Sequence, residues 1–105
     1  MVTKTLIKKL QMYAESIQQE GIPVDALILF GSRASGKSTR DSDIDVCVVS
    51  KKFGTDPIEE GCFLQRLAHR IDPRIEPLAI SLADYRTNTW LPILHAIRTT
   101  GVKVV

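Results

Sequence analysis

The sequence predicts a small α/β domain in which helices flank a small mixed β-sheet, in the order αβ(α)βαβα(β). Two observations favour this class: apolar side chains recur at helical spacing in three segments, and short runs of apolar or β-branched residues separate them. The chain has 105 residues, of which 44% are hydrophobic and 25% charged, as in an ordinary globular domain. We expect a single domain over residues 1–105.

The first half of the chain is typical of a helix followed by two strands. In residues 3–20 apolar side chains recur every three or four positions, and Gly21 ends the predicted helix. Residues 26–30 (ALILF) are a continuous apolar run and residues 44–49 (IDVCVV) are rich in β-branched side chains, so each predicts a strand. The polar residues 31–42 between them are expected to form a loop that opens with a strand-to-helix turn.

The second half predicts a helix, a strand and a final helix. Asp56 is the expected cap of the first helix, with Pro57 at its first position and Glu59 completing an Asp-x-x-Glu capping box. Residues 74–81 (RIEPLAIS) predict the strand, and Pro77 within it favours the edge of the sheet. The last predicted elements are a helix over residues 89–100 and a short strand over residues 102–105.

The charge, hydropathy and cysteine patterns exclude several classes of protein. Lys and Arg number 14 against 12 Asp and Glu, and this formal charge of +2 does not predict binding of nucleic acid by bulk charge. No apolar run is long enough to cross a bilayer or to form a signal-peptide core. Cys47 and Cys62 lack the spacing of a metal or redox motif. We expect a cytoplasmic protein with no membrane partner.

Two familiar motifs match the letters of residues 30–49 but not their context. Residues 31–38 (GSRASGKS) fit the P-loop pattern, but the acidic segment follows too soon to leave room for the helix that a P-loop opens. Three aspartates alternate within residues 41–45, as in a calcium-binding loop. Val46 and Lys52 then occupy the places where that loop requires Gly and Glu. We expect neither kind of loop.

A third interpretation uses the pair Gly31-Ser32, followed after ten residues by Asp43-Ile44-Asp45. Because side chains two positions apart on a strand share a face, Asp43 and Asp45 would present two carboxylates side by side. Such a pair repels itself unless a cation lies between, and its oxygen ligands suit Mg²⁺ bound together with substrate phosphates. A solvated turn is the alternative, but a charge at Asp45 inside an apolar strand is costly unless it is paired.

The loop between the two motifs offers groups for a triphosphate. Gly31 lets the backbone approach a phosphate closely, and Ser32 can hold its oxygens. Arg33, Lys37 and Arg40 lie in the same loop and could neutralise the phosphate charge. A pair of metal ions would then clamp the attacking and leaving oxygens of an in-line displacement.

These residues resemble the signature of the polymerase-β-like nucleotidyltransferase superfamily. In that family h-G-S is followed after a loop by D-h-D-h, as in FGSRASGKSTRDSDIDVCVV at residues 30–49. IDPRIEP at 71–77 resembles the region of the family's third carboxylate, and HAIRTTGVKVV at 95–105 resembles the end of its short prokaryotic members. The chain is similar in size to the minimal nucleotidyltransferases, stand-alone catalytic domains often encoded beside a small helical HEPN protein.

The resemblance implies a polymerase-β-like fold and roles for five residues. Gly31 and Ser32 would bind the triphosphate of the substrate ATP, while Asp43 and Asp45 would hold two Mg²⁺ ions. Glu76 would complete the metal site near the attacking hydroxyl; the alternative is an exposed carboxylate on an edge strand.

The activity implied is transfer of AMP from ATP to an acceptor hydroxyl, with release of pyrophosphate. The resemblance favours an antitoxin that adenylylates, and so silences, a HEPN ribonuclease. Two alternatives stay open. One is a binding module that neutralises its partner sterically and tolerates loss of both aspartates. The other is transfer to a small molecule such as an aminoglycoside, for which this chain has no room to supply an acceptor-binding domain.

Overall fold

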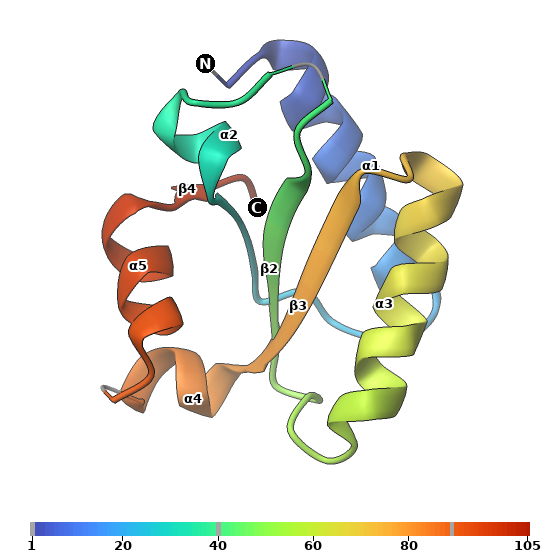
Figure 1. Ribbon diagram of the computed structural model, residues 1–105. Coiled ribbons are helices and arrows are strands. Elements are labelled where there is room, and N and C mark those ends of the chain that lie inside the picture. The colour runs from blue at the N-terminus through green and yellow to red at the C-terminus, as the bar shows by residue number, and fades with distance from the viewer. Residues whose placement is uncertain (1, 40, 89) are drawn as a thin grey trace.

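The fold class predicted from the sequence is confirmed. The computed structural model describes residues 2–39, 41–88 and 90–105. Its elements in chain order are α1 (Lys4–Gln19), β1 (Ala26–Phe30), α2 (Ser32–Ser35), β2 (Ile44–Ser50), α3 (Pro57–Ile71), β3 (Ile75–Ser81), α4 (Leu82–Thr87), α5 (Pro92–Thr100) and β4 (Val102–Lys103) (Figure 1).

The described strands form one mixed sheet in the order β3-β2-β1-β4. β1 runs antiparallel to both β2 and β4, whereas β2 and β3 run parallel. A parallel pair needs a crossover connection, and α3 supplies it between β2 and β3 (Figure 1). β3 lies at one edge of the sheet, which confirms the position that Pro77 favoured.

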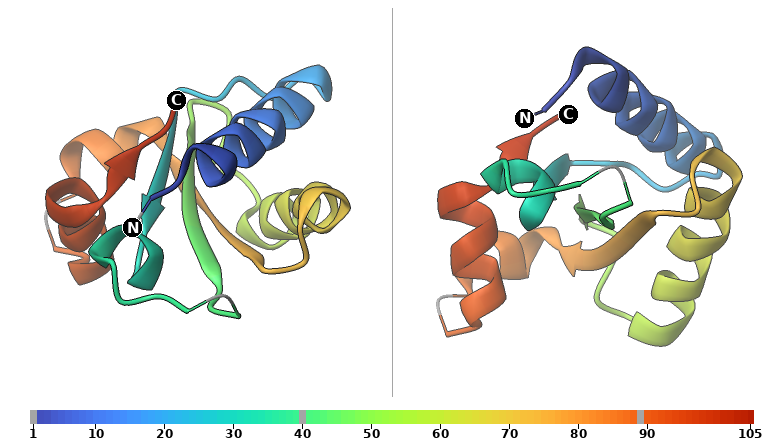
Figure 2. Two further views of the ribbon diagram at one scale, coloured as in Figure 1. Left: turned by 90° about the horizontal axis from the view of Figure 1, so that it is seen from above. Right: turned by 45° about the horizontal axis from the view of Figure 1, so that its top comes forward.

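Helices cover both faces of the sheet, and Figure 2 shows α1 and α3 on one side and α4 and α5 on the other. Val46 and Val48 of β2 pack into the core beneath α1 and α3. Cys47 and Val49 point the other way and pack with α5. Because side chains alternate along a strand, Asp45 shares the face of Cys47. The carboxylate therefore lies on the α5 side of the sheet, at the start of β2.

The short helix expected between the first two strands is present as α2, within residues 31–42. The structure differs from the sequence prediction later in the chain, where two helices, α4 and α5, replace the single helix predicted over 89–100. The predicted start of that helix, Thr89, lies outside the described residues. α5 begins at Pro92, since proline suits the first helical turn. Asn88 fixes the turn before α5, because its Oδ1 accepts hydrogen bonds of 3.1 Å from the amides of Trp90 and Leu91.

The capping box predicted for α3 is correct in one half and wrong in the other. Asp56 Oδ1 accepts a hydrogen bond of 3.2 Å from the Glu59 amide, as expected. The carboxylate that reaches back is that of Glu60, not Glu59. It accepts from the amides of Gly54 at 3.0 Å and of Thr55 and Asp56 at 3.2 Å each. Glu60 therefore closes the loop between β2 and α3, which is too irregular for the Asp-x-x-Glu spacing to describe.

A buried tyrosine joins the two helices on one face of the sheet. Tyr13 of α1 is fully buried, and its hydroxyl donates a 2.8 Å hydrogen bond to the Leu64 carbonyl of α3. Burial raises the pKa of Tyr13 above its ordinary value, so the phenol stays protonated.

Tyr13→Phe is expected to lower the free energy of unfolding by about 1 kcal/mol, the net contribution of one buried hydrogen bond. Urea denaturation measures this change. Tyr85→Phe is the matched control, because no hydrogen bond of the Tyr85 hydroxyl is found within the described ranges. We expect the control to change stability by less than about 0.5 kcal/mol. Equal effects of the two substitutions would contradict a structural role for the Tyr13 hydroxyl.

Candidate active site

A glycine brings the end of β1 against the carboxylate of Asp45. Gly31 links β1 to α2 with φ of 72° and ψ of −151°, a backbone conformation that side-chain-bearing residues rarely adopt. A Cβ atom at Gly31 would collide with Asp45 Oδ2 and would lie 3.2 Å from its Cγ. Gly31 therefore brings the backbone close to Asp45, while the close approach to a phosphate expected of Gly31 stays a prediction. Ser32 follows it as the first residue of α2.

Strand pairing places the two strand carboxylates side by side. Asp45 of β2 pairs with Glu76 of β3 in the parallel register, and neighbouring strands lie about 4.8 Å apart. On its other side Asp45 pairs with Phe30, the residue before Gly31. Asp43 precedes β2 and is exposed, as is Glu76, whereas Asp45 is partly buried. The site thus gathers where β2 and β3 begin and β1 ends.

The charges of the two aspartates act on each other. Burial raises the pKa of Asp45, and the negative charge of Asp43 raises it further. The ionised form of Asp45 is therefore less favourable in this position than in water. A cation or a cationic group bound between the aspartates would relieve the repulsion.

The carboxylates suit Mg²⁺ by their chemistry. Oxygen ligands from one or two carboxylates, completed by substrate phosphates, are what Mg²⁺ binds in nucleotide sites. In the ranges that the structure describes, no three His, Cys, Asp or Glu side chains gather closely enough to hold a metal ion without other ligands. Asp45 and Glu76 are neighbours by register and Asp43 acts on Asp45, so the donor set fits a metal that the substrate helps to bind. The role of Asp43, Asp45 and Glu76 as metal ligands stays a prediction.

The short helix and the strand exclude the two rival motifs. α2 ends at Ser35 with Gly36 as its cap, before Lys37, whereas a P-loop would begin its helix at that lysine. Ile44 and Val46 are fully buried in β2 and are not loop residues, which excludes a calcium-binding loop.

Comparison with known families decides which proteins this arrangement belongs to. Residues 10–92, most of the chain and all of the site, match the family model described as Nucleotidyltransferase domain. The chain belongs to this family. No match was found among the curated proteins.

Solved structures with the same fold include further nucleotidyltransferases. One is a Sulfolobus solfataricus protein described as a nucleotidyltransferase, with a TM-score of 0.63 and 16% identity, covering 92% of this chain and 77% of that one. A toxin–antitoxin structure with AMP-PNP has a TM-score of 0.63 and 24% identity, and the match covers 94% of this chain and 72% of that one. A mutant of the toxin–antitoxin MntA–HpeT has a TM-score of 0.60 and 20% identity, and the match covers 92% of this chain and 71% of that one. At these identities the likeness is one of fold.

The basic residues of the nucleotidyltransferase site are arranged less simply than the sequence predicted. The Arg33 guanidinium donates a 2.9 Å hydrogen bond to the Ser42 carbonyl and so ties α2 to the segment that enters Asp43. Lys37 is exposed, with its amide bonded to the Ser32 carbonyl at 3.1 Å. Arg40 lies outside the described residues. The contact of Arg33 shows it holding the loop, while phosphate binding by these three cations stays a prediction.

Sequence reasoning missed an acidic residue that anchors the start of β3. Asp72 is 6% exposed, and its Oδ1 accepts from the amide of Arg74 at 2.9 Å and from its Nε at 3.1 Å. Its Oδ2 accepts from Arg74 Nη2 and from Lys9 Nζ, both at 2.7 Å. The Arg74 carbonyl in turn accepts from the Ile44 amide at 2.8 Å.

This anchor sets the register in which Glu76 faces Asp45. The hydrogen bonds from Arg74, and then those from Lys9, hold the pKa of Asp72 well below its usual range. The signal in the sequence was an aspartate at the end of a helix, two residues before an arginine. Lys9 could not have been assigned to it, because it is far away in the chain.

The helices of the nucleotidyltransferase domain all pack on the sheet. None of those that the structure describes is long and apolar enough to span a membrane.

Proposed function

We propose that this nucleotidyltransferase transfers AMP from ATP to a hydroxyl group of a partner protein, with Mg²⁺ as cofactor and pyrophosphate as the second product. One observation carries the proposal: Asp45 stands opposite Glu76 in the strand register and against the Gly31 backbone. A carboxylate pair next to the backbone of a glycine, which has no side chain, is suited to a metal-bound triphosphate.

The fold relatives support the adenine nucleotide and the aspartates. One was solved with AMP-PNP, an analogue of ATP. Another is a mutant in which two aspartates, at the spacing of Asp43 and Asp45, are changed to glutamate. Both are toxin–antitoxin structures, which supports a protein partner. Together with the resemblance of the sequence to the minimal nucleotidyltransferases, this favours an antitoxin that modifies a HEPN ribonuclease.

The mechanism assigns each group a place. Asp43, Asp45 and Glu76 would hold Mg²⁺, which when bound neutralises phosphate charge and favours the ionised form of the attacking hydroxyl. Gly31, which has no side chain, would let the triphosphate approach the backbone beside Asp45, and the Ser32 hydroxyl, at the same turn, would hold its oxygens. The acceptor oxygen forms a bond to the α-phosphorus as the bond to pyrophosphate breaks. The hydroxyl proton passes to solvent or to a carboxylate, of which Glu76 is the more exposed strand residue.

The position of the transferred label tests the proposal. Purified protein is incubated with Mg²⁺ and with ATP labelled at either the α- or the γ-phosphate. The acceptor is supplied either by host lysate or by a co-expressed neighbouring protein. We expect label from the α-position alone on a protein band, and none with Asp43→Asn combined with Asp45→Asn. Glu15→Gln, which changes an exposed carboxylate on α1, should transfer as the wild type does.

Each of the other outcomes would indicate a different function for this protein. Transfer from the γ-position would make the chain a kinase and overturn the proposal. Label on a small molecule would favour the aminoglycoside type of acceptor. No transfer, together with neutralisation of the partner by the double variant, would favour a steric antitoxin.

A further inference from the structure

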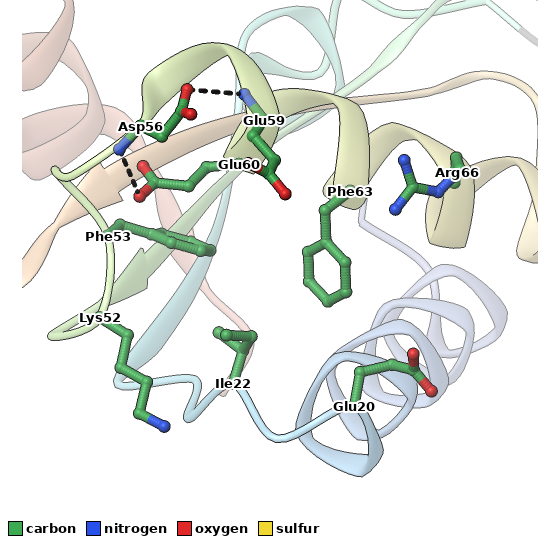
Figure 3. A pocket seen from close by; sticks show the side chains of 9 residues that line it. All are labelled: Glu20, Ile22, Lys52, Phe53, Asp56, Glu59, Glu60, Phe63 and Arg66. Atoms are coloured by element: carbon green, nitrogen blue, oxygen red, sulfur yellow. Dashed lines mark hydrogen bonds between the residues drawn. The ribbon is translucent and has the colours of Figure 1, made fainter.

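A hollow lies at the other end of the sheet from the candidate active site, between the end of α1 and the start of α3. It encloses about 300 Å³, and Figure 3 shows the rings of Phe53 and Phe63 and the side chain of Ile22 turned toward it. Glu20, from the end of α1, and Glu59, from the first turn of α3, lie at its rim (Figure 3). Ligand pockets have volumes of about 300–1,000 Å³, so this hollow lies at the small end of that range and has room for one long side chain.

The hollow is too far from the candidate active site to share its chemistry. Phe53 follows the last residue of β2, Ser50, whereas Asp45 is near the first. A strand rises about 3.3 Å per residue, so about 16 Å of strand separates Asp45 from Ser50 alone. Whatever binds in the hollow does not touch the reacting groups.

The lining of the hollow carries more negative than positive charge. Four carboxylates contribute, from Glu20, Asp56, Glu59 and Glu60, against two cations, from Lys52 and Arg66.

Two of these carboxylates are used to build the wall. Glu60 accepts hydrogen bonds from three consecutive amides of the β2–α3 loop, and Asp56 caps the Glu59 amide. Lys52 bonds to the Gly21 carbonyl at 3.3 Å, across the loop that follows α1. Within the described part of the chain, neither Glu20 nor Glu59 forms an ion pair, so both rim charges are available to a ligand.

Phe53 is only 6% exposed, so it is mainly the partly buried Phe63 ring, beside the unpaired carboxylates, that offers an apolar face to a cation on an apolar stem. A guanidinium stacks on aromatic faces and forms paired hydrogen bonds with a carboxylate, while its alkyl stem packs on apolar surface. The geometry points to this hollow as the docking site for an arginine side chain of the partner protein. The inference rests on the proposed function in taking the acceptor to be a protein.

An exposed isoleucine favours a protein over a free small cation. Ile58, in the first turn of α3 between Asp56 and Glu59, is 81% exposed. A small cation in the hollow would leave this side chain in water, whereas a protein surface docked there covers it. Arginine at the centre of an interface, surrounded by contacts that exclude water, is a frequent source of binding energy.

Titration with a short peptide tests the docking site in the absence of any nucleotide. The probe is acetyl-Gly-Leu-Arg-Gly-amide, followed through the backbone amide signals of the ¹⁵N-labelled protein. We expect shifts at Gly54, Glu59 and Phe63, and binding about tenfold weaker when Glu20→Gln and Glu59→Gln are combined. Arg66→Gln is expected to bind more tightly, because it removes a competing cation. A gain of affinity cannot arise from damage to the fold.

Control ligands decide between the possible occupants. The same peptide with citrulline, a neutral analogue of arginine, should bind at least tenfold more weakly; equal binding would overturn the role of charge. Free arginine that bound as tightly as the peptide would show a small-molecule site and overturn docking by a protein. No shifts with any ligand would overturn the site altogether. Asp45→Asn should bind the peptide as the wild type does. A failure of the docking site would therefore leave the proposed nucleotidyl transfer untouched, and a failure of nucleotidyl transfer would leave the docking site untouched.

Discussion

Asn in place of Asp45 is expected to abolish nucleotidyl transfer while leaving the fold as stable as before, or more stable. Burial and the charge of Asp43 raise the pKa of Asp45, so its ionised form is less favourable in the folded protein than in water. A neutral amide of the same shape removes that penalty. The same change removes a metal ligand, and losing several kcal/mol of transition-state stabilisation slows transfer by about 10³-fold or more.

Two assays on one preparation measure both halves of this prediction. Transfer of α-label is followed with Mg²⁺, and urea unfolding is followed with EDTA. EDTA added to the wild type should also stop transfer without unfolding the protein. Glu15→Gln is the matched control, since it removes one exposed carboxylate from α1. A joint loss of activity and stability in Asp45→Asn would show a structural aspartate, and full activity would remove Asp45 from the mechanism.

The sequence predicts well those features of the site that depend on local spacing. Asp43 and Asp45 were expected to lie close together because they are two residues apart, and the charge of Asp43 does act on Asp45. Asp43 itself lies just before β2 and not within it. Gly31 could be assigned to the turn after a buried strand, and its positive φ suits glycine there, while its approach to a phosphate stays a prediction. Glu76 could be placed on an edge strand, but its position opposite Asp45 depends on the register between two strands.

That register is set by contacts that no local pattern contains. Asp72 reaches both Lys9 on α1 and Arg74 before β3, and the Arg74 carbonyl binds Ile44. Helix α4 was not predicted as a separate element, because six residues are too few to show a helical period. The bounds of α2 could not be given for the same reason, although a short helix was expected between the first two strands. The hollow near α3 likewise combines residues from distant segments, from Glu20 to Arg66.

Asp72→Asn is expected to lower the free energy of unfolding by about 2 kcal/mol at neutral pH, because the two cations bound to Asp72 lose a buried charged partner. The carboxylate is 7% exposed, while Lys9 and Arg74 are 29% and 35% exposed and can be rehydrated. The loss should therefore be smaller than for a pair that is wholly buried. Urea denaturation at pH 7 measures it.

The pH dependence of this loss identifies the charge as its cause. The pKa of Asp72 in the folded protein lies well below the value of about 3.9 for an unfolded aspartate. A lowered pKa contributes stability that is complete above about pH 5 and is lost as the pH falls toward the folded value. The gap between wild type and Asp72→Asn should thus narrow below about pH 4. A gap that stayed constant would assign the loss to packing.

The effects of Asp72→Asn on activity should be the reverse of those of Asp45→Asn. Asp72 touches no reacting group, but its contacts with Arg74 hold the start of β3 against Ile44. Without them Glu76 is held less firmly opposite Asp45, and we expect transfer to fall by about tenfold, in proportion to a modest loss of positioning. Asp45→Asn is thus expected to be stable but inactive, whereas Asp72→Asn is expected to be less stable and to keep about a tenth of the transfer activity. Finding that Asp72→Asn is as inactive as Asp45→Asn, although folded at the assay temperature, would make Asp72 part of the site itself.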